Sequence, residues 1–146
     1  MPPGSVTEVR VRYAETDQMG RAHHGAYVTW FELGRTEMMR QSGVSYAAME
    51  RRGVLLPVVR LEVDYLAGAS YEDLLEIHTT LDEVRSRRVR FAYRVVAGED
   101  GRTVAEGATT LICMGPDGRP RRLPEDVRTA LAELAGNGRE AGSERT

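Results

Sequence analysis

The sequence contains no lysine, so all 20 of its basic residues are arginines. Against 22 aspartates and glutamates they leave a net charge of −2. This balance provides no broad cationic surface and argues against a nucleic-acid-binding protein. A GC-rich genome or adaptation to high temperature explains the arginine bias, but arginine is also the side chain that binds phosphate with two parallel hydrogen bonds. Composition alone does not separate these explanations.

Cysteine is nearly absent and long apolar runs are missing. The single Cys113 cannot form an internal disulfide or a multi-cysteine zinc site. No segment reaches the roughly 18 consecutive apolar residues that a membrane helix needs. The first residues also lack the basic start and the apolar core of a signal peptide. The sequence therefore predicts a cytoplasmic protein that does not insert into membranes.

Hydrophobic periodicity is clear in the first third of the chain. Apolar alternation at Val9, Val11 and Tyr13 predicts a strand with one buried face. From His24 to Gly43 the apolar residues recur at helical spacing, which predicts a long amphipathic helix. A short helix is predicted over Tyr46–Arg52.

Four further segments alternate with a period of two, and short turn-forming clusters separate them. These predicted strands lie at 59–65, 75–81, 88–95 and 103–113. A last helix is predicted over Pro124–Leu134, and the Gly- and Glu-rich residues 137–146 are predicted to be disordered. We therefore expect one α+β domain over residues 1–136, with a meander of antiparallel strands wrapped around the long helix. Open sheet edges in so small a domain predict a homodimer or homotetramer.

Candidate catalytic residues gather between the first strand and the long helix, at Asp17, His23 and His24. The first turn of a helix presents unpaired N–H groups and a partial positive charge, which stabilise a developing oxyanion. A carbonyl docked there would meet this donor on one side and Asp17, as nucleophile or general base, on the other. From position alone, a structural cap at Asp17 and ordinary helix-start histidines stay open as interpretations. No metal site is predicted, because adjacent histidines point to different sides and no third ligand stands at suitable spacing.

Several segments together carry a resemblance to a known family. They are YAETDQMGRAHHGAY at Tyr13–Tyr27, Trp30–Glu32 with Arg35, Val58–Tyr65, Asp73–Ile77 and Arg119–Pro124. The chain resembles the 4-hydroxybenzoyl-CoA thioesterase family of hotdog-fold proteins, and in particular the Tol-Pal-associated, YbgC-like acyl-CoA thioesterases. The resemblance spans roughly residues 7–135. It implies the hotdog fold, in which a five-stranded antiparallel sheet wraps around one long helix.

The resemblance also implies roles for individual residues. Asp17 matches the family's catalytic aspartate, which attacks the thioester carbonyl or activates water. His24 matches the residue whose backbone N–H polarises that carbonyl, and Gly25 would let the substrate approach the helix start closely. The residues that match the wall of the acyl pocket are Tyr13, Tyr27 and Val59. A place for Tyr27 in the hydrophobic core stays open as an alternative.

Two positions depart from the usual pattern of the family. An aspartate commonly stands two residues before the catalytic one, where this chain has Glu15. Glu15 keeps an acid close to Asp17 and is given no role. Smaller residues are frequent where this chain has Gln18 and Met19, which leaves the acyl-chain preference open.

The substrate implied by the resemblance is an acyl- or aroyl-CoA, so coenzyme A is part of the substrate and no separate cofactor is expected. Its 3′-phosphate and pyrophosphate suit arginine side chains. The candidate phosphate-binding residues are Arg60, Arg87 and Arg88, followed by Arg119, Arg121 and Arg122. Each is equally explained as solvated surface. Two other functions stay open: a non-catalytic acyl-CoA-binding module of the same fold, and a dehydratase of a related fold.

Overall fold

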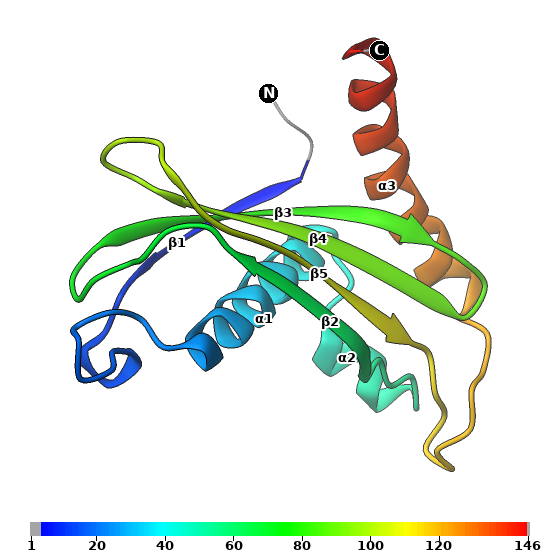
Figure 1. The fold of residues 1–146 in the computed structure, drawn as a ribbon. Coiled ribbons are helices and arrows are strands. Elements are labelled where there is room, and N and C mark those ends of the chain that lie inside the picture. The colour runs from blue at the N-terminus through cyan, green and yellow to red at the C-terminus, as the bar shows by residue number, and fades with distance from the viewer. Residues whose placement is uncertain (1–3, 146) are drawn as a thin grey trace.

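The computed structural model describes residues 4–145, and their side chains as far as residue 135. In chain order the elements are β1 (Ser5–Arg10), the 3₁₀ turn η1 (Tyr13–Glu15), α1 (His24–Gln41), α2 (Tyr46–Arg51), β2 (Val58–Tyr65), β3 (Leu74–Val84), β4 (Arg88–Ala97), β5 (Thr103–Ile112) and α3 (Glu125–Arg145). The five antiparallel strands form one curved sheet that wraps around α1 (Figure 1). The predicted α+β architecture is confirmed.

The order of strands in the sheet is β1-β3-β4-β5-β2, so β1 and β2 form its two edges. The prediction of a simple meander is therefore wrong for β2, which pairs with β5 and not with β3. The connection over residues 66–73 crosses the sheet instead of forming a hairpin. Eight residues reach up to about 26 Å. This exceeds the roughly 14 Å that three strand spacings require.

The first strand is shorter than predicted. β1 ends at Arg10, and the chain then turns into η1, which leaves 77% of the surface of Tyr13 exposed. The backbone of Val11 bonds to the crossing connection, since its N–H donates to the carbonyl of Asp73 and its carbonyl accepts the N–H of Glu72, both at 2.9 Å. Tyr13 therefore does not share the buried face of the strand, contrary to the prediction.

Two glycines allow α1 to lie close to the sheet. A Cβ atom at Gly34 would lie 2.3 Å from Thr79 Oγ1 on β3, and one at Gly107 would lie 2.6 Å from the ring of Phe31. The Phe31 ring stacks on Tyr93 of β4 with 4.3 Å between ring centroids. The apolar face predicted for the long helix is buried as expected, at Tyr27, Trp30, Phe31, Gly34 and Met38.

Cys113 follows β5 and is fully buried and unpaired, as expected for a small apolar residue. Burial raises the pKa of its thiol, and the positive charge of Arg121 opposes this only in part. The thiolate, which is the reactive form of cysteine, is therefore disfavoured.

The last helix, α3, ends at Arg145, beyond the predicted end at Leu134. Val127 and Leu131 are buried, and the helix contacts β3. Neither α3 nor another described helix is long and apolar enough to cross a membrane.

Candidate functional site

Residues 16–22, here called the Asp17 loop, form a closed loop between η1 and α1. Thr16 and Ala22 form an isolated antiparallel bridge at its base. The N–H of Asp17 donates to the carbonyl of Arg21 at 2.8 Å. The exposed carboxylate accepts the N–H groups of Met19 at 2.9 Å and Arg21 at 3.2 Å, both through Oδ1. Oδ2 has no hydrogen-bond partner among the described residues, so this oxygen is available for chemistry.

Glu15, which precedes the loop, holds a buried carboxylate with 7% of its surface exposed. Its carboxylate accepts the N–H of Arg12 at 2.9 Å and the indole N–H of Trp30 at 3.0 Å. Its carbonyl accepts the N–H of His23 at 2.9 Å. Burial raises the pKa of Glu15, but the hydrogen bonds from Arg12 and Trp30 outweigh this effect and hold the pKa below its ordinary value.

α1 begins at His24, directly after the loop. The N-cap residue His23 makes no side-chain hydrogen bond to the helix, so its first N–H groups have no capping side chain. His24 and Gly25 are exposed, which leaves these groups accessible. Asp17, His24 and Gly25 thus lie in one continuous segment. Glu15 precedes the Asp17 loop and accepts the N–H of His23, so it connects the two ends of that loop. In the described part of the chain, no three His, Cys, Asp or Glu side chains gather as a metal site requires.

The end of β2 packs on the start of α1. The hydroxyl of Tyr65 donates to the carbonyl of His24 at 3.2 Å. Its ring lies edge-on to the imidazole of His24, with 4.9 Å between centroids, and edge-on to Tyr27 at 5.0 Å. Tyr65 therefore links the edge strand of the sheet to the helix start.

The three residues predicted to line an acyl pocket lie in different surroundings. Tyr27 is 3% exposed and belongs to the core below the helix start, where burial raises its pKa. Tyr13 is exposed and packs edge-on against Tyr71 of the crossing connection, with 5.7 Å between centroids. Val59 is half-exposed near the beginning of β2, away from the helix start. Within one protomer these three side chains do not form a common wall.

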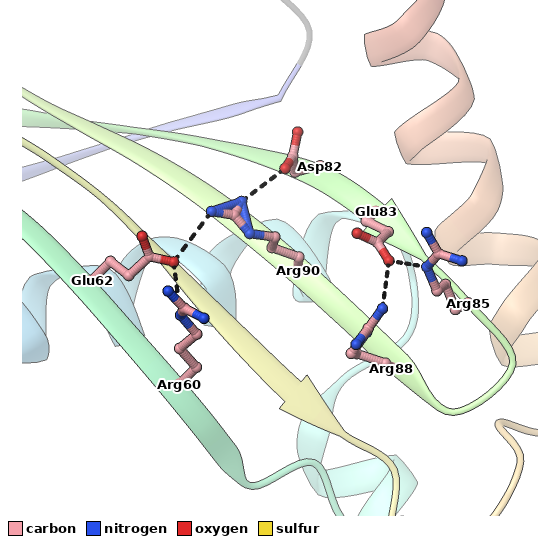
Figure 2. A network of polar contacts seen from close by, with 7 residues as sticks. All are labelled: Arg60, Glu62, Asp82, Glu83, Arg85, Arg88 and Arg90. Carbon is pink, nitrogen blue, oxygen red and sulfur yellow. Dashed lines mark hydrogen bonds and ion pairs between the residues drawn. The ribbon is translucent and has the colours of Figure 1, made fainter.

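Two of the predicted phosphate-binding residues lie on the face of the sheet turned away from α1 (Figure 2). Arg60 of β2 and Arg88 of β4 line an open hollow of about 580 Å³. Arg60 pairs with Glu62 at 3.0 Å, and Arg88 pairs with Glu83 at 3.2 Å. A phosphate in this hollow would have to share the arginines with these carboxylates. Arg87 is exposed in the turn between β3 and β4 and does not line the hollow.

Further ion pairs neutralise the same face. Arg90 contacts Asp82 at 3.0 Å and Glu62 at 3.5 Å, as Figure 2 shows. Arg85 pairs with Glu83, and this hydrogen bond, followed by that from Arg88, holds the pKa of Glu83 below its ordinary value. Four arginines thus share three carboxylates, so most of the positive charge on this face is neutralised within the protomer.

The starts of β2 and β4, where Arg60 and Arg88 line the hollow, lie at the opposite end of the sheet from the Asp17 loop (Figure 1). Arg88 pairs in register with Ile112 of β5, and the neighbouring Leu111 pairs with Val58, the first residue of β2. His24, in contrast, contacts Tyr65, the last residue of β2. Eight strand residues span about 23 Å. Arginines near the start of β2 therefore do not converge with Asp17 in the same protomer.

Sequence reasoning missed two contacts of the site. The hydroxyl of Tyr65 reaches His24 across 41 positions of sequence, and period-two alternation shows only that Tyr65 shares a strand face. The bond between Glu15 and Trp30 joins a loop to a helix face that periodicity assigns to the core. The sequence offers two weak signals for this bond. Glu15 is an acid two residues before Asp17, and Trp30 is the one tryptophan of the chain.

Comparisons with known proteins agree with this architecture. The family described as the thioesterase-like superfamily matches residues 11–131. Over 120 residues the chain is 34% identical to the acyl-CoA thioester hydrolase YbgC of Escherichia coli O6:H1, which covers 82% of this chain and 89% of that protein. The solved DHNA-CoA thioesterase from Staphylococcus aureus is 35% identical, covers 94% of both chains and superposes with a TM-score of 0.88. A hypothetical protein from Thermus thermophilus is 42% identical over 89% of this chain and 98% of that chain, with a TM-score of 0.84.

Proposed function

Since the chain belongs to the thioesterase-like superfamily, we propose that it hydrolyses an acyl- or aroyl-CoA to the free acid and coenzyme A at the Asp17 loop. The chain is a thioester hydrolase with the hotdog fold. The observation that carries the proposed site is the junction of an exposed carboxylate, at Asp17, with the uncapped start of α1 at His24.

Asp17 supplies the group that starts the reaction. The loop holds Oδ1 through two N–H groups and leaves Oδ2 free, so Oδ2 attacks the thioester carbonyl carbon or takes a proton from an attacking water. Direct attack releases the CoA thiolate and forms an anhydride that water then cleaves. Attack by water gives the acid in one addition and elimination. Both routes pass through a tetrahedral oxyanion.

The start of α1 stabilises that oxyanion. The N–H groups of His24 and Gly25 have no capping side chain and lie at the positive end of an 18-residue helix. The backbone of Gly25 does not have a positive φ angle, so the helix conformation itself does not require a glycine at this position. A Cβ at this position would lie 3.3 Å from the imidazole of His23 and would narrow the approach to the N–H groups.

We propose that a second copy of the chain completes the site. β2 is an edge strand of the sheet, with no neighbouring strand on one side. Several large apolar residues of β2, and Leu66 directly after it, are exposed: Val58, Val59, Leu61, Tyr65 and Leu66. Antiparallel pairing of two β2 strands buries this edge. It also brings the start of the partner's strand beside the end of this one, next to the start of α1. A homodimer therefore brings the strand that carries Val59 and Arg60 of the partner subunit to the edge of the site, with the arginine side chain on the face of the sheet turned away from α1.

Hydrolysis of a panel of acyl- and aroyl-CoA esters, followed with a thiol reagent, tests the reaction. Cys113 is buried and does not add to the signal. Asp17→Asn keeps an oxygen that accepts the loop's N–H groups but removes the base or nucleophile. We expect it to fold normally and to lose roughly 100- to 10,000-fold in kcat.

Gly25→Ala is the second arm, because alanine favours the helix but obstructs its first N–H groups. We expect a lower kcat/KM with an unchanged or higher unfolding midpoint. Wild-type turnover by Asp17→Asn would refute the proposed site. Binding of CoA without turnover of any ester would support the non-catalytic module instead.

A further inference from the structure

We propose that Glu15 is a positioning residue, whose buried carboxylate holds the Asp17 loop against α1 through the indole of Trp30. The inference rests on the proposed function and adds to it a residue that neither binds the substrate nor reacts. It concerns how the nucleophile or base keeps its place relative to the helix start.

Glu15 is connected to both ends of the Asp17 loop. At the first end it is covalently linked to Thr16, the first residue of the loop. At the other end its carbonyl accepts the N–H of His23, the residue that precedes α1, at 2.9 Å. Its side chain then reaches the second turn of α1, where the indole N–H of Trp30 donates at 3.0 Å. One residue thereby ties the start of the loop, its end and the helix together.

Both members of the side-chain contact depend on it. Trp30 is 1% exposed, so its N–H has no access to water, and an unpaired buried donor is costly. The Glu15 carboxylate is likewise buried and accepts two further hydrogen bonds from Arg12, one from the backbone N–H at 2.9 Å and one from Nη2 at 3.5 Å. The guanidinium of Arg12 approaches from the surface, with its Nε 3.4 Å away and its side chain 72% exposed. The carboxylate is thus held in place by groups on each side.

The contacts of Glu15 are confined to the segment around the site. Its described hydrogen-bond partners are Arg12, His23 and Trp30, and none of them belongs to the sheet. Loss of the carboxylate should therefore move the loop relative to the helix and leave the sheet intact. A misplacement of about 1 Å in a reacting group can reduce the rate 100-fold. A fall in rate in a protein whose sheet stays intact therefore distinguishes a positioning role from a general contribution to stability.

Glu15→Gln tests the inference with little change in volume. The amide keeps one oxygen, but its NH₂ group must face either the indole N–H or the N–H of Arg12, which are both donors. We expect kcat to fall 10- to 100-fold and KM to change less than threefold. Trp30 is the only tryptophan, so its emission should also shift in the native state.

Trp30→Phe removes the same hydrogen bond from the helix side and keeps an aromatic ring. Because the two changes break one contact, the double variant should have a kcat close to that of the slower single variant. The matched control is Glu37→Gln, which removes an acid that pairs with Arg40 at 2.8 Å on α1 itself. It should retain wild-type kcat.

The outcomes separate this inference from the proposed function. An inactive Asp17→Asn variant beside a Glu15→Gln variant with wild-type kcat would overturn the positioning role and leave the proposed reaction standing. Turnover by Asp17→Asn would remove the function on which the inference rests. A loss of kcat that only matches the fraction of unfolded protein would also overturn it. If Glu15→Gln does not fold, Trp30→Phe and its kcat decide the question.

Discussion

The close approach of α1 to the sheet leads to a prediction about Gly34→Ala. A Cβ at this position would lie 2.3 Å from Thr79 Oγ1 and 3.1 Å from Ile77 Cγ2. Thr79 is 1% exposed, so it has little room to turn away. Overpacking of a core costs about 1–3 kcal/mol. The gain in helix propensity from glycine to alanine is about 1 kcal/mol. We expect a net loss of up to about 2 kcal/mol in the free energy of unfolding.

Thr79→Ala provides the partner change, because it removes the atom that the new Cβ would meet first. The Thr79 hydroxyl has no hydrogen-bond partner among the described residues, so its loss breaks no bond. The lost methyl group costs about 0.8 kcal/mol of burial. In this background Gly34→Ala should be neutral or stabilising. The double-mutant cycle should therefore show a coupling of about 2 kcal/mol between the two positions.

Equilibrium unfolding in urea, followed by the emission of Trp30 and by far-UV circular dichroism, measures all four proteins. Protein concentration is kept equal, because association would contribute to stability. Additive effects, with a coupling of less than about 0.5 kcal/mol, would refute the reasoning. They would mean that α1 does not lie as close to β3 as Gly34 and Thr79 indicate.

The β2 edge and the buried acid are open to tests of their own. Leu61→Arg places a charge on the β2 edge and should shift the protein from dimer to monomer in light scattering, whereas Val6→Arg on the opposite edge should not; a persistent dimer would contradict the proposed pairing. Because the folded pKa of Glu15 lies below its ordinary value of 4.5, its charge stabilises the fold above that value, and this contribution is lost as the pH falls through the folded pKa. The difference in unfolding free energy between wild type and Glu15→Gln should thus be full at pH 6 and shrink as the pH falls below 4.5, and a constant difference would exclude the charge as its source.

Periodicity was sufficient to locate the strands, the α-helices and the buried face of α1, but not the turn η1 or the ends of β1 and α3. Helical spacing placed Trp30 and Phe31 in the core correctly, because a helix on a sheet must bury one stripe. The family pattern located Asp17 and His24 in one segment, which the structure places between η1 and the first turn of α1. Local sequence determines both results.

Pairing between distant segments was beyond the sequence. Alternation identifies β2 as a strand but does not name its neighbour, and the crossing connection has the same turn-forming residues as a hairpin. Alternation also predicts only that Arg60, Arg88 and their partner carboxylates face outward. It does not predict which carboxylate pairs with which arginine. Glu15 was left without a role, because nothing in the sequence pattern connects it to Trp30, which lies 15 positions further along the chain.

The burial of Cys113 matters for an enzyme whose product is a thiol. Each turnover proposed here releases coenzyme A, and thiol–disulfide exchange with CoA disulfides requires a thiolate that the disulfide can reach. The single cysteine of the chain has no exposed surface and a raised pKa. The enzyme therefore cannot be capped by the coenzyme that it releases, and its activity should be the same under reducing and mildly oxidising conditions.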